Sequence, residues 1–239
     1  MANKTVHNFT IKLREDRVYD LYIDGVWVLS RGSHENVLEE LGEMPLPPYI
    51  HEKLKDKERY QTVFAEKIGA VAAPAAGMHF SKNLLKRLEI RGVETYTLTS
   101  HVGLGNFKPV DVEDLSKHKV ESEQISISAE LVAAVDKAHA GNKRICAVGT
   151  EGMRALEHVV GTNGQLKPYD GWTNKFIYPP YDFTVANAFF VNFYMPMSTQ
   201  LMMVAAFGGH DIVMKAYNTA VKTGYRFGDY GDAMLVLND

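Results

Sequence analysis

Apolar and polar residues near the N-terminus follow the period of a β-strand. In Phe9–Leu13 and Val18–Ile23 the two kinds of residue largely alternate, which is typical of a strand with one buried face. Asp24 and Gly25 then form a two-residue hairpin signal, and Val26–Leu29 supplies the returning strand. This pattern predicts a small β appendage at the start of the chain.

A short helix and a proline-rich linker are predicted next. His34–Leu41 is amphipathic with helical spacing and is stopped by Gly42. Prolines at 45, 47 and 48 then exclude a helix and favour an extended linker. We therefore expect a β appendage with one short helix in residues 1–42, and a larger domain in residues 43–239.

Strand-like and helix-like segments alternate through the larger domain. The predicted strands are Ile68–Ala73, Glu94–Ser100, Gln124–Ser128, Arg144–Val148, Lys175–Tyr178, Ala188–Phe193 and Tyr225–Leu237. The predicted helices are Ser81–Ile90, Ala129–Ala140, Glu151–Val160 (capped by Thr150), Ser198–Ala206 and His210–Thr223. Such alternation predicts an α/β fold with a barrel-like or mostly parallel sheet and flanking helices.

Composition and charge limit the classes of protein that fit. The 239 residues carry a net charge of −3, so no global basic field is available to hold a nucleic acid. The single cysteine, Cys146, excludes an internal disulfide and fits a reducing compartment. Met1–Arg14 lacks the apolar run of a signal peptide, and the longest apolar stretch is too short to cross a bilayer. A cytoplasmic α/β enzyme is expected.

The segments richest in unusual residues lie at or just beyond the ends of predicted strands. They are Pro74–Phe80, His101–Pro109, Gly149–Glu151, Tyr194–Ser198 and Phe227–Asp232. In parallel α/β folds the chemistry is placed at the carboxyl ends of the strands. We therefore expect these loops to meet in one site.

Two histidines in these loops are candidate ligand contacts. His79 follows a loop of small residues, although by itself it is better explained as a packed histidine near a helix start. His101 precedes a glycine-rich turn that lacks the spacing of a dinucleotide fingerprint, so a loop against a flat ligand and a simple tight loop fit equally well. The run His118–Glu123 offers proton-transfer groups but no metal-ligand spacing, and a solvated loop explains it better.

Two further segments have both a functional and a structural interpretation. Gly149–Arg154 begins a helix, whose free N–H groups bind anions, but Glu151 in the first turn opposes an anionic ligand. The alternative for Arg154 is a pair with Glu157 on one helix face. Tyr225–Asp232 combines aromatics that stack on a purine with carboxylates that bind ribose hydroxyls, and its alternative is a bulged edge strand.

Seven segments in one order carry a resemblance to a known family. They are MPLPPYI (44–50), RYQTVFA (59–65), GAVAAPAAGMHFS (69–81), HVGLGNFKPV (101–110), AVGTEGMRALE (147–157), NFYMPMSTQLMMVAAFGG (192–209) and YRFGDYGDAML (225–235). Together they resemble the S-adenosylmethionine:tRNA ribosyltransferase-isomerase family of queuosine biosynthesis. The resemblance implies an α/β barrel-like domain with a smaller β domain inserted, of which residues 1–42 would be a remnant.

The resemblance also implies an activity. The ribosyl part of S-adenosylmethionine would pass to the aminomethyl group of a deazaguanine base in tRNA and rearrange, while adenine and methionine leave. No metal is implied. The residues that the resemblance makes catalytic are His79, His101 and Glu123. The residues that it places around S-adenosylmethionine are Arg59, Tyr60, Gln61, Gly77, Phe80, Gly103, Gly105, Gly149, Thr150, Asn192, Tyr225, Arg226, Phe227, Tyr230 and Asp232.

The resemblance implies different roles for these residues in the reaction. Imidazole exchanges protons near neutral pH, so His79 or His101 is expected to remove the acidified proton beside the sulfonium. Glu123 or Asp232 would orient hydroxyl groups.

Several positions depart from the family pattern and keep other functions open. Glu151 stands where the family usually has threonine, Tyr194 replaces a histidine, and Met197 replaces a lysine. These changes remove positive charge, which an anionic tRNA would find unfavourable. The alternatives are an S-adenosylmethionine-using enzyme that acts on a small molecule or without an acceptor, and a non-catalytic S-adenosylmethionine-binding paralogue or partner subunit. The family's longer N-terminal segment leaves two alternatives: the barrel closes differently, or a second copy or another chain supplies the missing strands.

Overall fold

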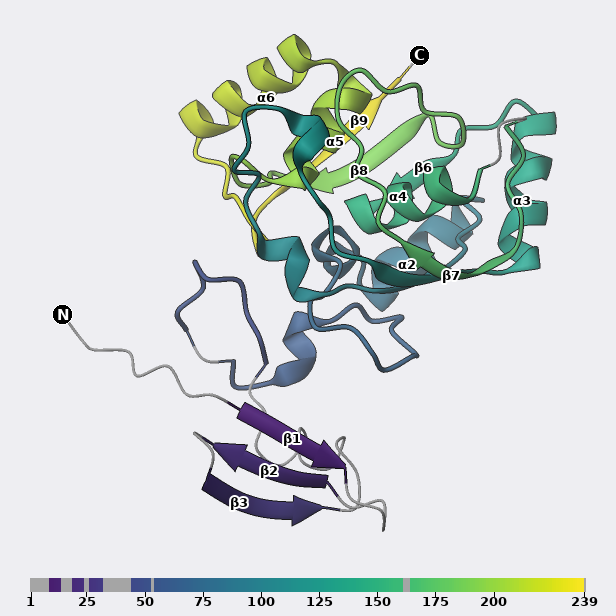
Figure 1. Ribbon diagram of the computed structural model, residues 1–239. Helices are drawn as coiled ribbons and strands as arrows, with labels where there is room; N and C mark the ends of the chain where they lie inside the picture. Colours follow the sequence, from purple (N-terminus) through teal and green to yellow (C-terminus); the bar gives the residue numbers. More distant parts are fainter. Residues whose placement is uncertain are drawn as a thin grey trace. The chain divides into compact units, whose positions relative to one another are not determined.

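The chain forms two compact units, Met1–Met44 and Pro45–Asp239. The computed structural model describes residues 9–13, 19–23, 26–31, 44–52, 54–160 and 164–238. In the first unit, β1 (Phe9–Leu13), β2 (Tyr19–Ile23) and β3 (Val26–Arg31) pair antiparallel in the order β1-β2-β3 (Figure 1). The three strands predicted in this part of the chain are therefore present. The predicted turn at 24–25 and helix at 34–41 lie outside the described residues.

The second unit starts with short 3-10 turns rather than with the predicted strand Ile68–Ala73. These turns are η1 (Lys57–Tyr60) and η2 (Ala75–His79), and they precede the helix α2 (Lys82–Ile90). Ile68 is 95% exposed, and the segment makes two backbone hydrogen bonds, both to the carbonyl of Val102. The strand prediction was wrong because a run of small apolar residues, here Ala72 and Ala73, fits a buried coil as well as a strand.

An antiparallel sheet follows in the order β4-β5-β7. Its strands are β4 (Thr99–His101), β5 (Glu123–Ile127) and β7 (Tyr169–Thr173), and further 3-10 turns η3 (Leu104–Phe107) and η4 (Leu115–Lys117) lie between the first two. The predicted strand Lys175–Tyr178 is absent. Ile177 is fully buried, and the ring of Phe176 packs on that of Tyr178. The strand-like pattern of this segment therefore reflects the burial of its side chains, and the segment is not part of a sheet.

A second sheet holds the centre of the larger unit. It consists of β6 (Cys146–Val148), β8 (Ala188–Asn192) and β9 (Ala233–Leu237), with β6 parallel and β9 antiparallel to β8. The α/β class is thus confirmed. Only the sheet β6-β8-β9 is mixed, however, and among the described strands only β6 and β8 pair in parallel. The segment Tyr225–Asp232 forms a loop instead of the predicted first part of the last strand, so β9 begins at Ala233.

Four helices complete the unit. They are α3 (Ala129–Ala140), α4 (Gly149–Val159), α5 (Thr199–Gly208) and α6 (His210–Thr223). Ser81 accepts a hydrogen bond from Leu84 N and caps α2, as the sequence predicts. Thr150 does not cap α4: the helix begins one residue earlier, and its N-cap Val148 has no side-chain bond.

The hydrophobic core lies around β8. Phe189 and Val191 from β8 are fully buried together with Met153 from α4 and Val204 from α5. In Figure 1, α4 lies below β8 in the view, and α5 and α6 lie above it. This packing fixes the first turns of α4 and α5 next to the carboxyl end of β8, where the candidate site is found. No helix that the structure describes is long and apolar enough to cross a membrane.

Candidate functional site

Asp229 binds two tyrosines that come from the start of the larger unit. The Tyr49 hydroxyl lies 2.8 Å from Oδ1 of Asp229, and the Tyr60 hydroxyl lies 2.6 Å from Oδ2. Burial raises the pKa of Asp229, and the two tyrosine hydrogen bonds act in the opposite direction. The pKa values of both tyrosines are raised by burial and by Asp229, so both hydroxyls stay protonated and donate. Gly228 has φ 85° and no room for a Cβ beside the Tyr49 ring.

Asn192 at the end of β8 fixes the orientation of His79. Its Nδ2 donates to the carbonyls of Gly228 (2.9 Å) and Asp229 (3.2 Å), so its Oδ1 must face the histidine. Nε2 of His79 lies 3.2 Å from that oxygen and must therefore donate. The tautomer that follows leaves Nδ1 of a neutral His79 as the nitrogen that accepts a proton. The His79 ring packs edge-on against Phe190.

Glu123 and Arg154 form a buried ion pair. One carboxylate oxygen of Glu123 binds the Arg154 guanidinium, and the other accepts the backbone N–H of Gly103 at 3.0 Å. Both residues are less than 10% exposed. Burial lowers the pKa of Arg154 to about 10, so the guanidinium remains charged at neutral pH. The pair ties β5, α4 and the His101–Phe107 loop together.

Glu151 lies buried in the first turn of α4. Its carboxylate folds back over Gly149, which has φ 78°; a Cβ on that glycine would lie 2.8 Å from Oε2. Burial raises the pKa of Glu151 to about 7, and the nearby charge of Asp229 acts in the same direction. Oε2 has no hydrogen-bond partner within the described part of the chain.

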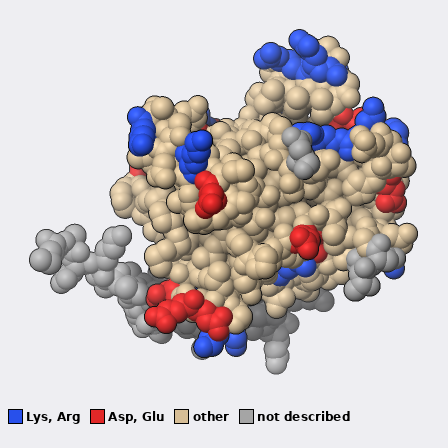
Figure 2. Space-filling view, turned by 90° about the horizontal axis from the view of Figure 1, so that it is seen from above, with Lys and Arg blue, Asp and Glu red and all other residues tan. Residues whose placement is uncertain are grey.

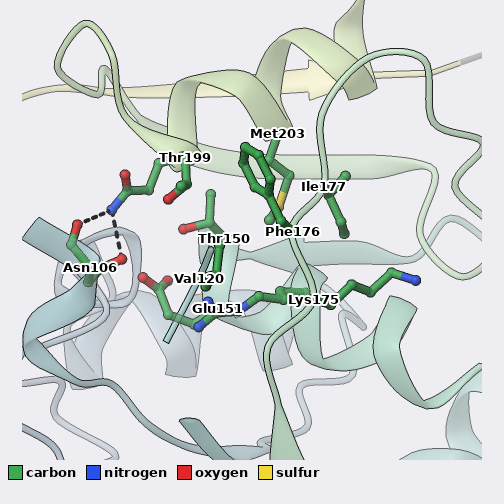
Figure 3. Close-up of a pocket in the computed structure, with 11 residues that line it drawn as sticks. Asn106, Val120, Thr150, Glu151, Lys175, Phe176, Ile177, Thr199 and Met203 are labelled. Atoms are coloured by element: carbon green, nitrogen blue, oxygen red, sulfur yellow. Dashed lines mark hydrogen bonds between the residues drawn. The ribbon is translucent and has the colours of Figure 1, made fainter. Parts of the chain in front are cut away.

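Glu151 and Arg154 line a small pocket between the first turns of α4 and α5. Its wall also contains Asn106, Val120, Thr150, Lys175, Phe176, Ile177, Thr199, Gln200 and Met203. Nε2 of Gln200 donates to the backbone carbonyl of Asn106 at 3.2 Å and to its Oδ1 at 2.8 Å. In Figure 3 the ammonium end of Lys175 points away from the other labelled residues. A second pocket adjoins it and is lined by Gly105, His118, Glu123 and Arg154, among others.

His101 is separate from the His79 group. Its Nδ1 is buried and has no hydrogen-bond partner among the residues that the structure describes. The ring lies against the backbone of Gly69, where an added Cβ would come within 2.5 Å of Nδ1. His101 therefore sits in a packed position at the end of β4, beside the coil that replaces the predicted strand.

The loop Tyr225–Asp232 packs partly on the core and partly on itself. Tyr225 and Phe227 stack against Phe193 with ring centroids 5.6 and 5.3 Å apart. Asp232 accepts the backbone N–H of Arg226, which is the main cause of its lowered pKa, and also pairs with the Arg226 guanidinium at 3.4 Å.

The last aromatic of this loop reaches the start of the larger unit. The Tyr230 hydroxyl donates to the backbone carbonyl of Arg59 at 3.1 Å. The ring of Tyr230 lies 6.1 Å from that of Tyr60, so Tyr230 also borders the Asp229 group.

The chain was compared with known families and proteins. A family model described as "Queuosine biosynthesis protein" matches residues 3–236. The chain belongs to this family. The resemblance carried by the seven motifs is thus confirmed over nearly the whole sequence.

Relatives in the queuosine biosynthesis family are strongly similar. The protein named S-adenosylmethionine:tRNA ribosyltransferase-isomerase from Phocaeicola vulgatus is 56% identical over 212 residues, which is 87% of this chain and 60% of that protein. The protein of the same name from Symbiobacterium thermophilum is 50% identical over 221 residues, 92% of this chain and 63% of that protein. The chain thus spans about three fifths of the length of these relatives.

A solved structure shares the fold. The crystal structure of S-adenosylmethionine tRNA ribosyltransferase from Thermotoga maritima aligns with a TM-score of 0.57 and 39% sequence identity. The alignment covers 68% of this chain and 51% of that one. The architecture described above is therefore that of a known family member.

The structure collects the family's expected site residues into two groups. The first surrounds Asp229 and holds Arg59, Tyr60, His79, Asn192 and Tyr230. The second surrounds Arg154 and holds Gly103, Gly105, Glu123 and Thr150. Gly149 joins the two through Glu151, and Phe80 contacts the first group through Phe190.

The remaining expected residues have mainly local contacts. Gln61 accepts a bond from the backbone of Thr62, and Tyr225, Arg226, Phe227 and Asp232 stabilise their own loop. Gly77 and Gly105 leave room for protein side chains: an added Cβ would lie 2.8 Å from Thr62 and 2.9 Å from Glu121, respectively.

Sequence reasoning missed four residues of these groups as partners. The central contacts are made by Tyr49, Glu151, Arg154 and Asp229. From the sequence, however, Tyr49 belonged to the proline-rich linker, and Arg154 was expected to pair with a neighbour on its own helix. Arg154 pairs with Glu123 instead of Glu157, which accepts bonds from Tyr181, Thr184 and Val185. The signal for Asp229 was its place among glycines and aromatics at 227–231. Among described residues, no group of three or more His, Cys, Asp or Glu could hold a metal.

Proposed function

We propose that this protein performs the ribosyl transfer and isomerisation of the S-adenosylmethionine:tRNA ribosyltransferase-isomerases in queuosine biosynthesis. The observation that carries this proposal is the family match over residues 3–236, together with 50–56% identity to proteins that bear that name. S-adenosylmethionine is then a substrate, and tRNA is the acceptor. Adenine and methionine are the groups that leave.

His79 is the group that we assign to proton removal. Asn192 holds its Nε2–H, so Nδ1 carries the lone pair needed to take the acidified proton next to the sulfonium. The Asp229 hydrogen bonds to Tyr49 and Tyr60 fix the loop whose carbonyls orient Asn192. His101 remains a second candidate base, but its packing against Gly69 gives its Nδ1 less room for a substrate.

Glu123 has a positioning role in this proposal rather than a proton-transfer role. Its two oxygens are already engaged by Arg154 and by the backbone of Gly103. It therefore holds the guanidinium at the boundary of both pockets and fixes the loop after His101. The adenosine is expected to contact the group around Tyr60, Tyr230 and Arg59, where aromatic rings offer stacking surfaces.

Binding of tRNA must depend on local patches. The net charge is −3, and on the face shown in Figure 2 the Lys and Arg side chains form separate small groups rather than one continuous stripe. Such a distribution predicts few phosphate contacts, and therefore an affinity for tRNA that depends only weakly on salt.

Mass spectrometry of reaction products tests the proposal directly. The protein is incubated with S-adenosylmethionine, with and without tRNA that carries the aminomethyl-deazaguanine precursor. Adenine and methionine released only with this tRNA support the proposal. Fragments released without tRNA would assign the protein to a small-molecule reaction. Intact S-adenosylmethionine in both tubes would leave a binding protein.

Substitutions at two histidines test whether His79 is the base. His79→Gln should abolish release of adenine, because glutamine cannot accept the proton. His210→Gln serves as the matched control, since His210 lies exposed at the start of α6 and pairs only with Asp211. Full activity of the His79→Gln variant would remove His79 from the mechanism.

A further inference from the structure

Glu151 presents a carboxylate oxygen with an unused bonding position to the pocket between α4 and α5. The residue is 6% exposed, and its Oε2 accepts no hydrogen bond from the described residues. A buried oxygen without a partner costs free energy, so folding alone does not account for a glutamate at this position. Glu151 itself lines the pocket, so a small bound group can supply the missing partner.

Among the residues that the structure describes, no cation near Glu151 is available to compensate its charge. Arg154 lines the same pocket but is bound to Glu123. Lys175 also lines it, but its Nζ lies over the Tyr181 ring, 5.1 Å from the centroid, and Figure 3 shows this end directed away. The other ionisable groups facing Glu151 are Asp229 and Tyr194. The charge of Asp229 raises the pKa of Glu151, and the charge of Glu151 raises the pKa of Tyr194.

An anionic ligand group does not fit this position. The first turn of a helix normally attracts anions through its free N–H groups. Here the Glu151 carboxylate itself accepts from its own backbone N–H and lies over Gly149, so that it occupies the place that an anion would take. The first turn of α4 has therefore been changed from an anion site into a site for positive charge.

We propose that Glu151 binds the positively charged centre of a small ligand, a sulfonium or an ammonium group, in this pocket. The inference rests on the proposed function, because S-adenosylmethionine carries both kinds of cation. Glu151 would then favour this substrate over the product adenine, which carries neither cation. Since burial raises the pKa of Glu151 to about 7, binding of a cation near neutral pH also releases a proton from the protonated fraction.

Calorimetric titration of the wild-type protein at pH 7 measures both effects. The three ligands are S-adenosylmethionine, S-adenosylhomocysteine, which keeps only the ammonium group, and methylthioadenosine, which has neither cation. We expect about 10- to 100-fold weaker binding of methylthioadenosine, as for loss of a charge-assisted hydrogen bond. Affinity for S-adenosylhomocysteine close to that for S-adenosylmethionine assigns the ammonium group, and a large loss assigns the sulfonium.

The variant Glu151→Gln separates this role from a structural one. It should reduce the preference for the charged ligands at least about tenfold and eliminate the proton release, which is measured by repeating the titration in buffers of different ionisation enthalpy. The control is Glu130→Gln, which makes the same change in the exposed first turn of α3 and should change neither value.

The outcomes distinguish this inference from the proposed function. If Glu151→Gln keeps the full preference while the wild type binds S-adenosylmethionine, the inference is overturned and the proposed function stands. If the wild type neither binds nor consumes S-adenosylmethionine with precursor tRNA, both fail. If circular dichroism shows that the variant does not fold, proton release by the wild type decides, and binding without release overturns the inference.

Discussion

Arg154 on α4 and Glu123 at the start of β5 form an ion pair that is buried on both sides. Glu123 comes from a strand of the antiparallel sheet, and Arg154 comes from the helix that packs on the other sheet. The pair therefore connects the two halves of the larger unit at the edge of the candidate pocket.

Breaking this pair should strongly destabilise the protein. Glu123→Gln leaves a charged guanidinium buried without its partner, which typically costs about 3 to 5 kcal/mol. Urea denaturation measures the free energy of unfolding. Glu89→Gln is the matched control, because it breaks an exposed pair with Lys86 and should cost less than about 1 kcal/mol. Equal losses in the two variants would contradict the assigned importance of burial.

Alanine substitutions at two glycines three residues apart should change the stability of the protein in opposite directions. Gly149→Ala places a side chain at φ 78° and within 2.8 Å of Glu151 Oε2, so it should destabilise the protein by about 1 to 2 kcal/mol. Gly152→Ala meets no atom within 4 Å inside the same helix and should stabilise it by roughly 0.4 to 1 kcal/mol. Thermal and urea unfolding of both variants provide the comparison, and a stabilising Gly149→Ala would refute the geometry.

Asn192 should be required for stability as well as for the orientation of His79. Asn192→Ala removes the donor to the Asp229 carbonyl and the acceptor of His79 Nε2–H, while the Gly228 carbonyl keeps the N–H of Gly231. We therefore expect a loss of roughly 1 to 3 kcal/mol in the free energy of unfolding. Asn218→Ala, on the exposed face of α6, should change it by less than about 0.5 kcal/mol. If neither substitution changes the free energy of unfolding in the same denaturation experiment, the prediction for Asn192 is contradicted.

Glu151 should make stability depend on pH in a defined direction. Its folded-state pKa is about 7, above the value of 4.5 for an unperturbed side chain, so the folded state binds more protons between these two values. Its contribution is therefore most favourable below pH 4.5 and is lost as pH rises to about 7.

The variant Glu151→Gln isolates this contribution. Relative to the wild type, it should gain stability as pH rises from 5 to 8, by up to roughly 3 kcal/mol. Asp229, whose pKa is also raised by burial, is present in both proteins, so only its coupling to Glu151 enters the difference. A difference that does not change with pH would show that Glu151 is ionised at every pH tested.

The sequence was sufficient for elements whose signals are local. The helix Ala129–Ala140 was predicted at its observed bounds, and Ser81 caps α2 through its own hydroxyl. Predictions failed where the partner decides the structure. Ile68–Ala73 and Lys175–Tyr178 have strand-like patterns, but no neighbouring backbone pairs with them along their length. Periodicity indicates which side chains are buried, and it does not indicate what the N–H groups bind.

The same difference between local signals and contacts with distant elements applies to the candidate site. The motifs directed attention to His79, Tyr60 and Asn192, and the structure places all three around the Asp229 loop. Glu151 was noted as a departure from the family pattern and as a charge that opposes an anionic ligand, and Asp229 was noted only within the segment Tyr225–Asp232. Their importance depends on burial and on charges from other elements, and neither property can be read from neighbouring residues in the sequence.

The tyrosine contacts of Asp229 also constrain the order in which the protein can be made. Tyr49 and Tyr60 lie 180 and 169 residues before their common acceptor. During synthesis, both tyrosines leave the ribosome long before Asp229 exists, so neither bond can form until the chain has been made through residue 229. The loop that orients Asn192 and His79 therefore reaches its final arrangement only after that segment has been synthesised.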